Sequence, residues 1–317
     1  MNRYLMLIIL LSAGLITGLS GISSNAEYGF KMLNIPVGVG IAGQASAGTF
    51  SNWDASAFLE NPAAVVLRSE KLISVTQNSY LMDTNQNSVF YSYANGKKHF
   101  GIGLRTLDYG SIEKRDDTGQ IIGNFHPLDL NLMMSTGYRL HPDHYAGINA
   151  GLIYEKIDAA SSYGAVFDFG YTYLPPLRDT KLYAAVRNIG MTSKMDKEEI
   201  TLSKRLDIGI SREYSPRKYH ALKTSFEFKS IFESGSAWRG SLGTQASYQD
   251  QLSLRLGTDV NYLVDAVSDN GYDDALTWTI GVGFHMTHFV VDYAYTPYQL
   301  ATTDSDAVHR IGVTYRF

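Results

Sequence analysis

The sequence has no cysteine, little charge and no long apolar run beyond its N-terminus. The absence of cysteine excludes disulfides, thiolate metal sites and cysteine nucleophiles. Charged residues make up only 18% of the 317 residues, and the formal net charge is −4. With no cluster of Lys and Arg, a nucleic-acid partner is not expected. No later stretch approaches the ~20 apolar residues of a membrane helix.

The N-terminus has the features of a secretory signal peptide. Arg3 opens a positive segment, Leu5–Leu15 is an apolar run, and Ser24–Ala26 is a small-x-small cleavage site. The alternative is an uncleaved membrane anchor, for which the apolar run is short. We therefore predict a signal peptide at residues 1–26 and an exported mature chain that begins at Glu27.

Apolar and polar residues alternate from about Lys71 to Phe317, in runs of about ten residues, longer than a usual soluble strand. The clearest runs are Tyr163–Tyr173, Leu252–Tyr262 and Leu276–Met286. Their polar faces carry mainly Gly, Ser, Thr and Asn, whereas a soluble β-sandwich would show Lys and Glu there. Lipid leaves no partner for a sheet edge, so such strands must close. The fold class predicted is all-β: a transmembrane antiparallel β-barrel of about 14 strands in the bacterial outer membrane.

The chain ends on an aromatic residue of an alternating strand. Tyr315 and Phe317 share the apolar face of this strand with Val313. This ending resembles the β-signal that the barrel-assembly machinery reads. We therefore expect that machinery and the outer-membrane lipids to be partners of the chain.

Motifs of catalysis and cofactor binding are weak. Gly38–Gly43 matches G-x-G-x-x-G, but no βαβ unit follows it, so a tightly packed backbone is the better interpretation. His285 and His288 would lie on opposite faces of a strand and could not both bind a metal. No G-x-S-x-G is present. The chain is expected to be no enzyme, with no cofactor and no metal.

The segment between the signal peptide and the barrel lacks strand alternation. It contains a Gly/Ala-rich run at Gly38–Ala47, then Asp54 as a helix N-cap and Asn61-Pro62 as a helix stop. A barrel of about fourteen strands is too wide for its wall side chains to fill. We therefore predict that residues 27–70 form a hatch inside the lumen of a barrel at residues 71–317, with Asn61 hydrogen-bonded to the wall.

The polar faces of the predicted strands carry charges of both signs. Ion pairing across the lumen is the simpler interpretation, and a selectivity surface is the alternative. The charged residues expected to point inward are Arg105, Asp129, Asp168, Arg187, Asp207, Glu227, Arg239, Arg255, Asp259, Asp292, Arg310 and Arg316.

Several motifs resemble the PorV/PorQ family of outer-membrane proteins, which are relatives of the FadL-type barrels. The sequence departs from the family pattern at Leu59-Glu60, where an aromatic pair is common, and at Ala64, where Gly often follows. The motifs that carry the resemblance are Asp54-Ala55-Ser56-Ala57 and Asn61-Pro62-Ala63 within Val37–Leu67, Asp108-Tyr109-Gly110 within Leu107–Asp129, Phe167-Asp168-Phe169-Gly170 and Arg187-Asn188-Ile189-Gly190.

The resemblance implies a barrel with an N-terminal hatch and two possible functions. A PorV/PorQ-like protein would take part in type IX secretion and surface attachment, with secretion-pathway proteins as partners captured at loops such as Glu113–Asn124. A FadL-like protein would pass a hydrophobic small molecule through the hatch and a lateral opening of the wall. The Asn-Pro-Ala element is common to both, whereas the segment around Asp108-Tyr109-Gly110 favours PorV/PorQ.

Overall fold

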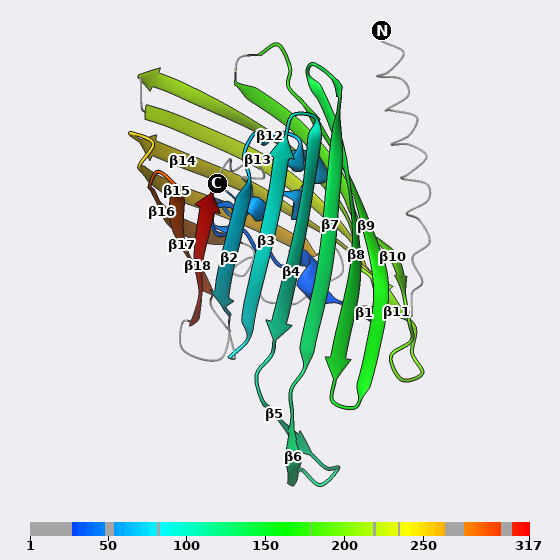
Figure 1. Ribbon diagram of the computed structural model, residues 1–317. Helices are drawn as coiled ribbons and strands as arrows, with labels where there is room; N and C mark the ends of the chain where they lie inside the picture. Colours follow the sequence, from blue (N-terminus) through cyan, green and yellow to red (C-terminus); the bar gives the residue numbers. More distant parts are fainter. Residues whose placement is uncertain are drawn as a thin grey trace.

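The computed structural model is a closed antiparallel β-barrel with the N-terminal part of the chain inside it (Figure 1). It describes residues 27–47, 54–80, 83–177, 179–217, 220–233, 235–263, 276–298 and 306–317. The expected signal peptide and its cleavage site lie outside the described residues.

Fourteen strands form the barrel, which confirms the predicted fold class and strand number. Each strand pairs with its neighbours along the chain, and the last strand closes the barrel on the first. The strands are β2 (Leu72–Ser79), β3 (Asn85–Asn95), β4 (Lys98–Asp108), β7 (Leu128–His141), β8 (His144–Ile157), β9 (Ala160–Tyr173), β10 (Thr180–Thr192), β12 (Lys204–Arg217), β13 (His220–Glu233), β14 (Gly235–Tyr248), β15 (Leu252–Leu263), β16 (Leu276–His285), β17 (Phe289–Tyr298) and β18 (Asp306–Arg316).

Alternation along the strands separates an apolar outer face from a polar inner face. Val313 is 41% exposed and Leu256 60% exposed, whereas Thr314 and Arg255 are buried. The hydroxyl of Thr314 lies 2.7 Å from that of Ser74 on the neighbouring strand, inside the barrel. Apolar side chains exposed all around a barrel fit lipid rather than water. In the part of the chain that the structure describes, no helix is long and apolar enough to span a bilayer.

Connections of different length mark the two ends of the barrel. One end has short turns such as 96–97, 142–143 and 249–251, and the C-terminal Phe317 lies there, where its N–H donates to the carbonyl of Lys71. Longer connections, such as 109–127 and 193–203, lie at the other end. Bacterial barrels place short turns in the periplasm and longer loops outside. The long-loop end is therefore the extracellular end.

The hatch consists of short elements that cross the lumen. One helix packs against β16, β17 and β18, another against β2, β3 and β4, and a third against β7, β8 and β9. Phe58 and Val65 pack with inward-facing side chains such as Phe90 and Met133 in one apolar core. The elements are β1 (Glu27–Gly29), η1 (Lys31–Asn34), α2 (Val39–Ala42), η2 (Ala55–Leu59) and η3 (Pro62–Val65).

Asp54 and Asn61, which begin two of the motifs in the hatch, act as helix caps. Asp54 caps η2 as expected, because its carboxylate accepts from the backbone N–H of Ser56 at 2.8 Å. The helix stop predicted at Asn61-Pro62 is confirmed, because η2 ends at Leu59. Asn61 also begins η3, where its side chain accepts from the N–H of Ala63 and Pro62 takes the first helical position. A proline that cannot continue one helix is well placed to start the next.

Asn61 and Pro62 sit where two wall glycines make room for them. The Asn61 amide donates to the Thr172 hydroxyl at 3.3 Å, which is the wall contact predicted from the sequence. A Cβ added at Gly170 would lie 2.1 Å from the Asn61 side chain, and one at Gly147 would lie 2.3 Å from Pro62. Glycine is therefore required here by the close approach of the hatch backbone.

Two short strands extend beyond the extracellular end of the barrel (Figure 1). They are β5 (Ile112–Arg115) and β6 (Ile121–Phe125), and they form a two-stranded hairpin within the segment expected to be a loop. Asp116 organises the hairpin tip, and hydrogen bonding from the Thr118 hydroxyl lowers the pKa of its carboxyl. The tip is a defined turn.

Candidate functional site: a split in the barrel wall

The hydrogen-bonded wall is interrupted between β10 and β12. These strands are in register from Thr180 opposite Arg212 to Arg187 opposite Arg205, and the pairing stops there, partway along β10. Beyond this point β10 pairs only with β9 among the described residues. The chain before β12 forms β11 (Ile200–Leu202), which pairs in parallel with the hatch strand β1. We call this gap between residues 189–192 and β11 the split.

A β-bulge in β10 begins the split. Val186 lies opposite Phe169 and Ile189 opposite Phe167, so that Arg187 and Asn188 together face Asp168. Asn188 has φ 60°, a left-handed conformation that asparagine tolerates better than most residues. The Asp168 carboxylate accepts from the N–H of Asn188 at 2.9 Å and holds this conformation. The bulge redirects the last residues of β10 away from β12.

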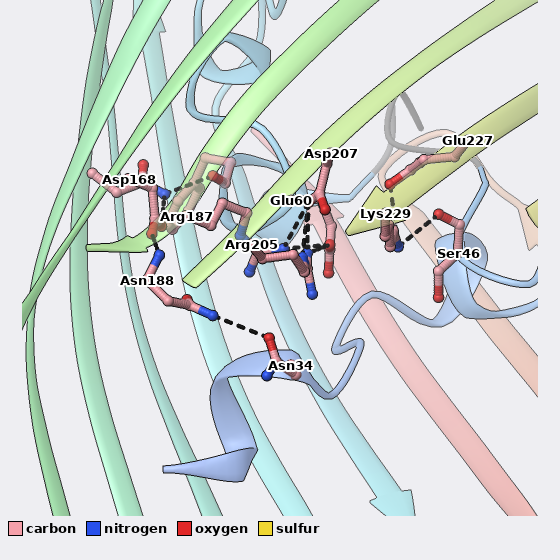
Figure 2. Close-up of polar contacts among 12 residues, drawn as sticks. Asn34, Ser46, Glu60, Asp168, Arg187, Asn188, Arg205, Asp207, Glu227 and Lys229 are labelled. Carbon is pink, nitrogen blue, oxygen red and sulfur yellow. Dashed lines mark hydrogen bonds and ion pairs between the residues drawn. The ribbon is translucent and has the colours of Figure 1, made fainter. Parts of the chain in front are cut away.

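Two opposed arginines mark the point where the pairing ends, and the hatch supplies a counter-charge (Figure 2). Glu60 accepts from Arg187 at 2.8 Å and from Arg205 at 3.1 Å. Asp207, on the same strand as Arg205, lies 2.8 Å from it. All four side chains are buried, with 7% exposure or less. Buried like charges repel strongly, so Glu60 stabilises the last pair of the β10–β12 register, Arg187 opposite Arg205.

Further hydrogen bonds join the hatch to residues beside the split (Figure 2). The Asn188 amide donates to Asn34 of the hatch at 3.0 Å and to the carbonyl of Ser203 at 2.9 Å. The N–H of Phe30 donates to the Glu155 carboxylate at 2.6 Å, next to the β1 pairing. The hatch therefore touches the split through a strand, a side-chain amide and a carboxylate.

A groove of about 450 Å³ lies along the split. Its apolar lining includes Met191, which is 74% exposed, together with Ile200 and the buried Leu202. Leu202 belongs to the same apolar core as Phe30 and Leu33 of the hatch. These three apolar side chains lead from the outside of the wall to the interior. The rest of the lining is Gly190 and the polar or charged residues Thr192, Lys194, Glu199, Thr201 and Lys204.

Tyr109 closes a second polar cluster near the extracellular end. Its hydroxyl donates to the Asp129 carboxylate at 3.0 Å, and Asp129 lies opposite Glu155 on the next strand. Burial raises the pKa of the Tyr109 phenol, and the charge of Asp129 acts in the same direction. Tyr109 therefore stays protonated and serves as a donor.

The structure brings only some of the sequence-predicted lumenal charges to the split. Asp168, Arg187 and Asp207 meet there, whereas Glu60 and Arg205 were not among the predicted residues. Glu227 pairs with Lys229 at 3.1 Å, and Arg316 lies 3.3 Å from Glu70 at the periplasmic end. The other predicted charges lie elsewhere in the wall. Arg105 donates to Asn131, Asp129 accepts from Tyr109, and Arg310 donates to Thr296. The remaining four form the pairs Arg255–Asp292 and Arg239–Asp259.

The remaining sequence motifs lie away from the split. Gly38–Gly43 forms the short helix α2 and no cofactor-type strand-turn-helix. His285 contacts the Ser253 hydroxyl at 3.1 Å, and His288 lies in the following turn. No cluster of His, Cys, Asp and Glu within the described ranges could hold a metal ion. The rings of Tyr315 and Phe317 are 4.9 Å apart at the periplasmic end.

Solved barrels share this architecture. Neither a protein-family model nor a curated protein matches the sequence. The toluene transporter TbuX of Ralstonia pickettii aligns with 14% identity and a TM-score of 0.60, covering 93% of this chain and 100% of TbuX. The monoaromatic hydrocarbon channel CymD aligns with 13% identity and a TM-score of 0.62, over 89% and 97% of the two chains.

A Pseudomonas aeruginosa FadL homologue gives 12% identity and a TM-score of 0.59, over 89% of this chain and 99% of the homologue. At these identities the likeness establishes the fold alone, a closed antiparallel β-barrel.

Proposed function

We propose that the chain is a non-catalytic outer-membrane channel for small hydrophobic molecules, which pass between the lumen and the bilayer through the split. The observation that carries the proposal is the interruption of the wall beyond Arg187 and Arg205. A groove borders it, and the groove's apolar residue Leu202 belongs to the hatch core. An unpaired strand edge is costly in lipid, so a barrel keeps one where it has a use. The solved neighbours include a toluene transporter and a hydrocarbon channel, which supports this class of cargo.

Closing the split tests the proposal. The chain has no cysteine, so a Thr192→Cys, Ile200→Cys pair can be oxidised without competing thiols. The Thr192 hydroxyl donates to the Ile200 carbonyl across the split, which places these residues together. Cells producing the oxidised variant should lose uptake of labelled toluene and regain it on reduction.

The matched control is Ala184→Cys with Ile208→Cys, a registered pair in the intact part of the same two strands. Its oxidation should leave toluene uptake unchanged. Equal uptake by both oxidised variants would show that cargo does not use the split.

A second function, a PorV/PorQ-like role in protein secretion or surface attachment, is favoured by the β5–β6 hairpin. It extends beyond the barrel, and its Ile121 and Ile122 are 55% and 57% exposed. Mass spectrometry of the purified native barrel separates the two functions. A bound hydrophobic molecule without a protein partner supports the channel, whereas a co-purifying exported protein that is lost on deletion of residues 112–125 supports secretion.

Two further proposals, on the protein's location and on its assembly, rest on the sequence. We propose export by a signal peptide cleaved after Ala26, and insertion by the barrel-assembly machinery through Tyr315 and Phe317. The protein should fractionate with the outer membrane, and its gel mobility should change on boiling. Deletion of Phe317 should lower outer-membrane levels and leave a protease-sensitive periplasmic chain, and unchanged levels would contradict the β-signal.

A further inference from the structure

A second cavity lies inside the barrel, between the hatch and the wall. Its volume is about 180 Å³, and it is bounded by hatch residues around Pro36 and Ala45 and by wall residues of β14, β16, β17 and β18. Tyr80, which directly follows β2, and Arg310, near the start of β18, also line it. Both of these positions belong to the extracellular half of the barrel. The cavity is separate from the groove on the outside of the split.

Arg310 is a buried cation with no counter-ion among the residues that the structure describes. It is 4% exposed, and it donates to the hydroxyls of Thr296 at 2.8 Å and Tyr80 at 3.4 Å. Its guanidinium lies over the Tyr80 ring, 5.2 Å from the centroid. Within the described ranges it forms no ion pair, and its buried Nε has no acceptor. Arg255 in the same wall, by contrast, has Asp292 at 2.6 Å. An isolated buried charge is unfavourable, and an anion beside it removes the penalty.

Arg239 supplies a second unused donor to the same cavity. One of its terminal nitrogens pairs with Asp259, whereas its buried Nε has no acceptor among the residues that the structure describes. Two guanidinium groups and one carboxylate leave a net charge of about +1 at this wall. Guanidinium N–H groups bind carboxylates with strong, directional hydrogen bonds. The charge and the donors therefore match one carboxylate.

The hatch side of the cavity is mainly apolar, with Asn34 and Ser46 as its polar residues. Ile35, Pro36, Ala42 and Ala45 face the arginines across it. We propose that the cavity binds a small organic acid, with its carboxylate at Arg310 and Arg239 and its apolar body against the hatch. This inference rests on the proposed channel function and adds small organic acids to its cargo. Asn34 lines the cavity and accepts from Asn188, so the site adjoins the split.

Calorimetry on the purified full-length barrel tests the site, with benzoate as the acid and benzamide as its neutral isostere. Charge-assisted hydrogen bonds predict binding of benzoate at least about tenfold tighter than that of benzamide. Arg310→Gln should abolish this preference, and Arg239→Gln should weaken it. Arg115→Gln, in the exposed hairpin, makes the same charge change and should leave the preference intact.

Gel mobility before and after boiling shows whether each variant is folded. Benzoate should also raise the unfolding temperature of the native protein and leave that of folded Arg310→Gln unchanged. Equal affinity for benzoate and benzamide, or a benzoate preference that persists in Arg310→Gln, would overturn the site. Toluene uptake that still depends on an open split would then leave the channel proposal standing, which separates the two failures.

Discussion

Two parts of the wall, β13–β14 and β10–β12, are built from the same alternating pattern and differ in how far they pair. β13 and β14 stay in register from His220 opposite Tyr248 to Glu233 opposite Gly235. β10 and β12 separate at Arg187. In the continuous part, Lys229 has Glu227 of its own strand at 3.1 Å.

At the split, the wall draws one of its counter-charges, Glu60, from the hatch. In the continuous wall, the cation therefore has an acid of its own strand, and the hatch adds only the neutral carbonyl of Ser46, at 3.3 Å from Lys229. At the split, the two arginines share a charged group of the hatch.

Glu60→Gln should have the largest effect. Removal of one partner from a buried ion cluster leaves Arg187 and Arg205 facing each other with Asp207 alone, a loss of about 3–5 kcal/mol. Urea unfolding of the barrel in lipid vesicles measures it. The control, Glu70→Gln, disrupts the partly exposed pair with Arg316 and should cost less than about 1 kcal/mol. Similar losses in both variants would contradict the role of Glu60.

Val313→Arg tests the continuous wall and should come second. Val313 faces outward from β18, and arginine at mid-membrane costs about 2–4 kcal/mol. Thr314→Ser, on the inner face of the same strand, should be nearly silent in the same unfolding measurement. Equal tolerance at the two positions would mean that the inner and outer faces are exchanged.

Gly170→Ala should displace the hatch at a cost of about 1–3 kcal/mol, because its new Cβ would overlap Asn61. Faster proteolysis of the hatch, followed by mass spectrometry, reports this displacement. Gly240→Ala, where an added Cβ meets no described residue within 4 Å, is the matched control. A hatch equally protected in both variants would show that this close approach is dispensable.

Substitutions of Asn188 should give the smallest change in stability. Comparing two of them separates the cost of backbone strain from the loss of side-chain hydrogen bonds. Asn188→Gly keeps the left-handed conformation and loses the bonds to Asn34 and Ser203. Asn188→Ala loses the same bonds and adds about 1 kcal/mol of strain. Thermal unfolding should therefore rank native above Gly and Gly above Ala. An alanine variant as stable as the glycine variant would show that backbone strain at residue 188 does not affect the stability of the bulge.

The barrel could be predicted from the sequence because the alternation that specifies its strands is a local pattern. Alternation at period two assigns residues such as Val313 and Thr314 to opposite faces whatever the neighbouring strand is. The need to close the sheet in lipid then leaves few architectures. The contact of Asn61 with the wall followed from a similar argument, since a buried amide requires partners.

The split could not be predicted, because it depends on which residues meet across strands. The motifs Phe167–Gly170 and Arg187–Gly190 enter the sequence argument only through a family resemblance. In the structure Arg187 and Asn188 face Asp168 across two strands, and this mismatch is the bulge. Glu60 drew notice only as a departure from a family pattern. Its pairing with Arg205 joins residues far apart in the chain. The one available signal was that Glu60 is an acidic residue in an otherwise apolar part of the hatch.

The distance across the split tests the account most directly. Spin labels at Met191→Cys and Lys204→Cys would report the separation of β10 from β12 at the groove, and Leu182→Cys with Ile210→Cys would report a registered pair below it. Pulsed electron paramagnetic resonance in lipid should show a longer, broader distance at the groove when Glu60→Gln is added, with the registered pair unchanged. Identical distances at the groove with and without Glu60 would contradict a split that the hatch holds closed.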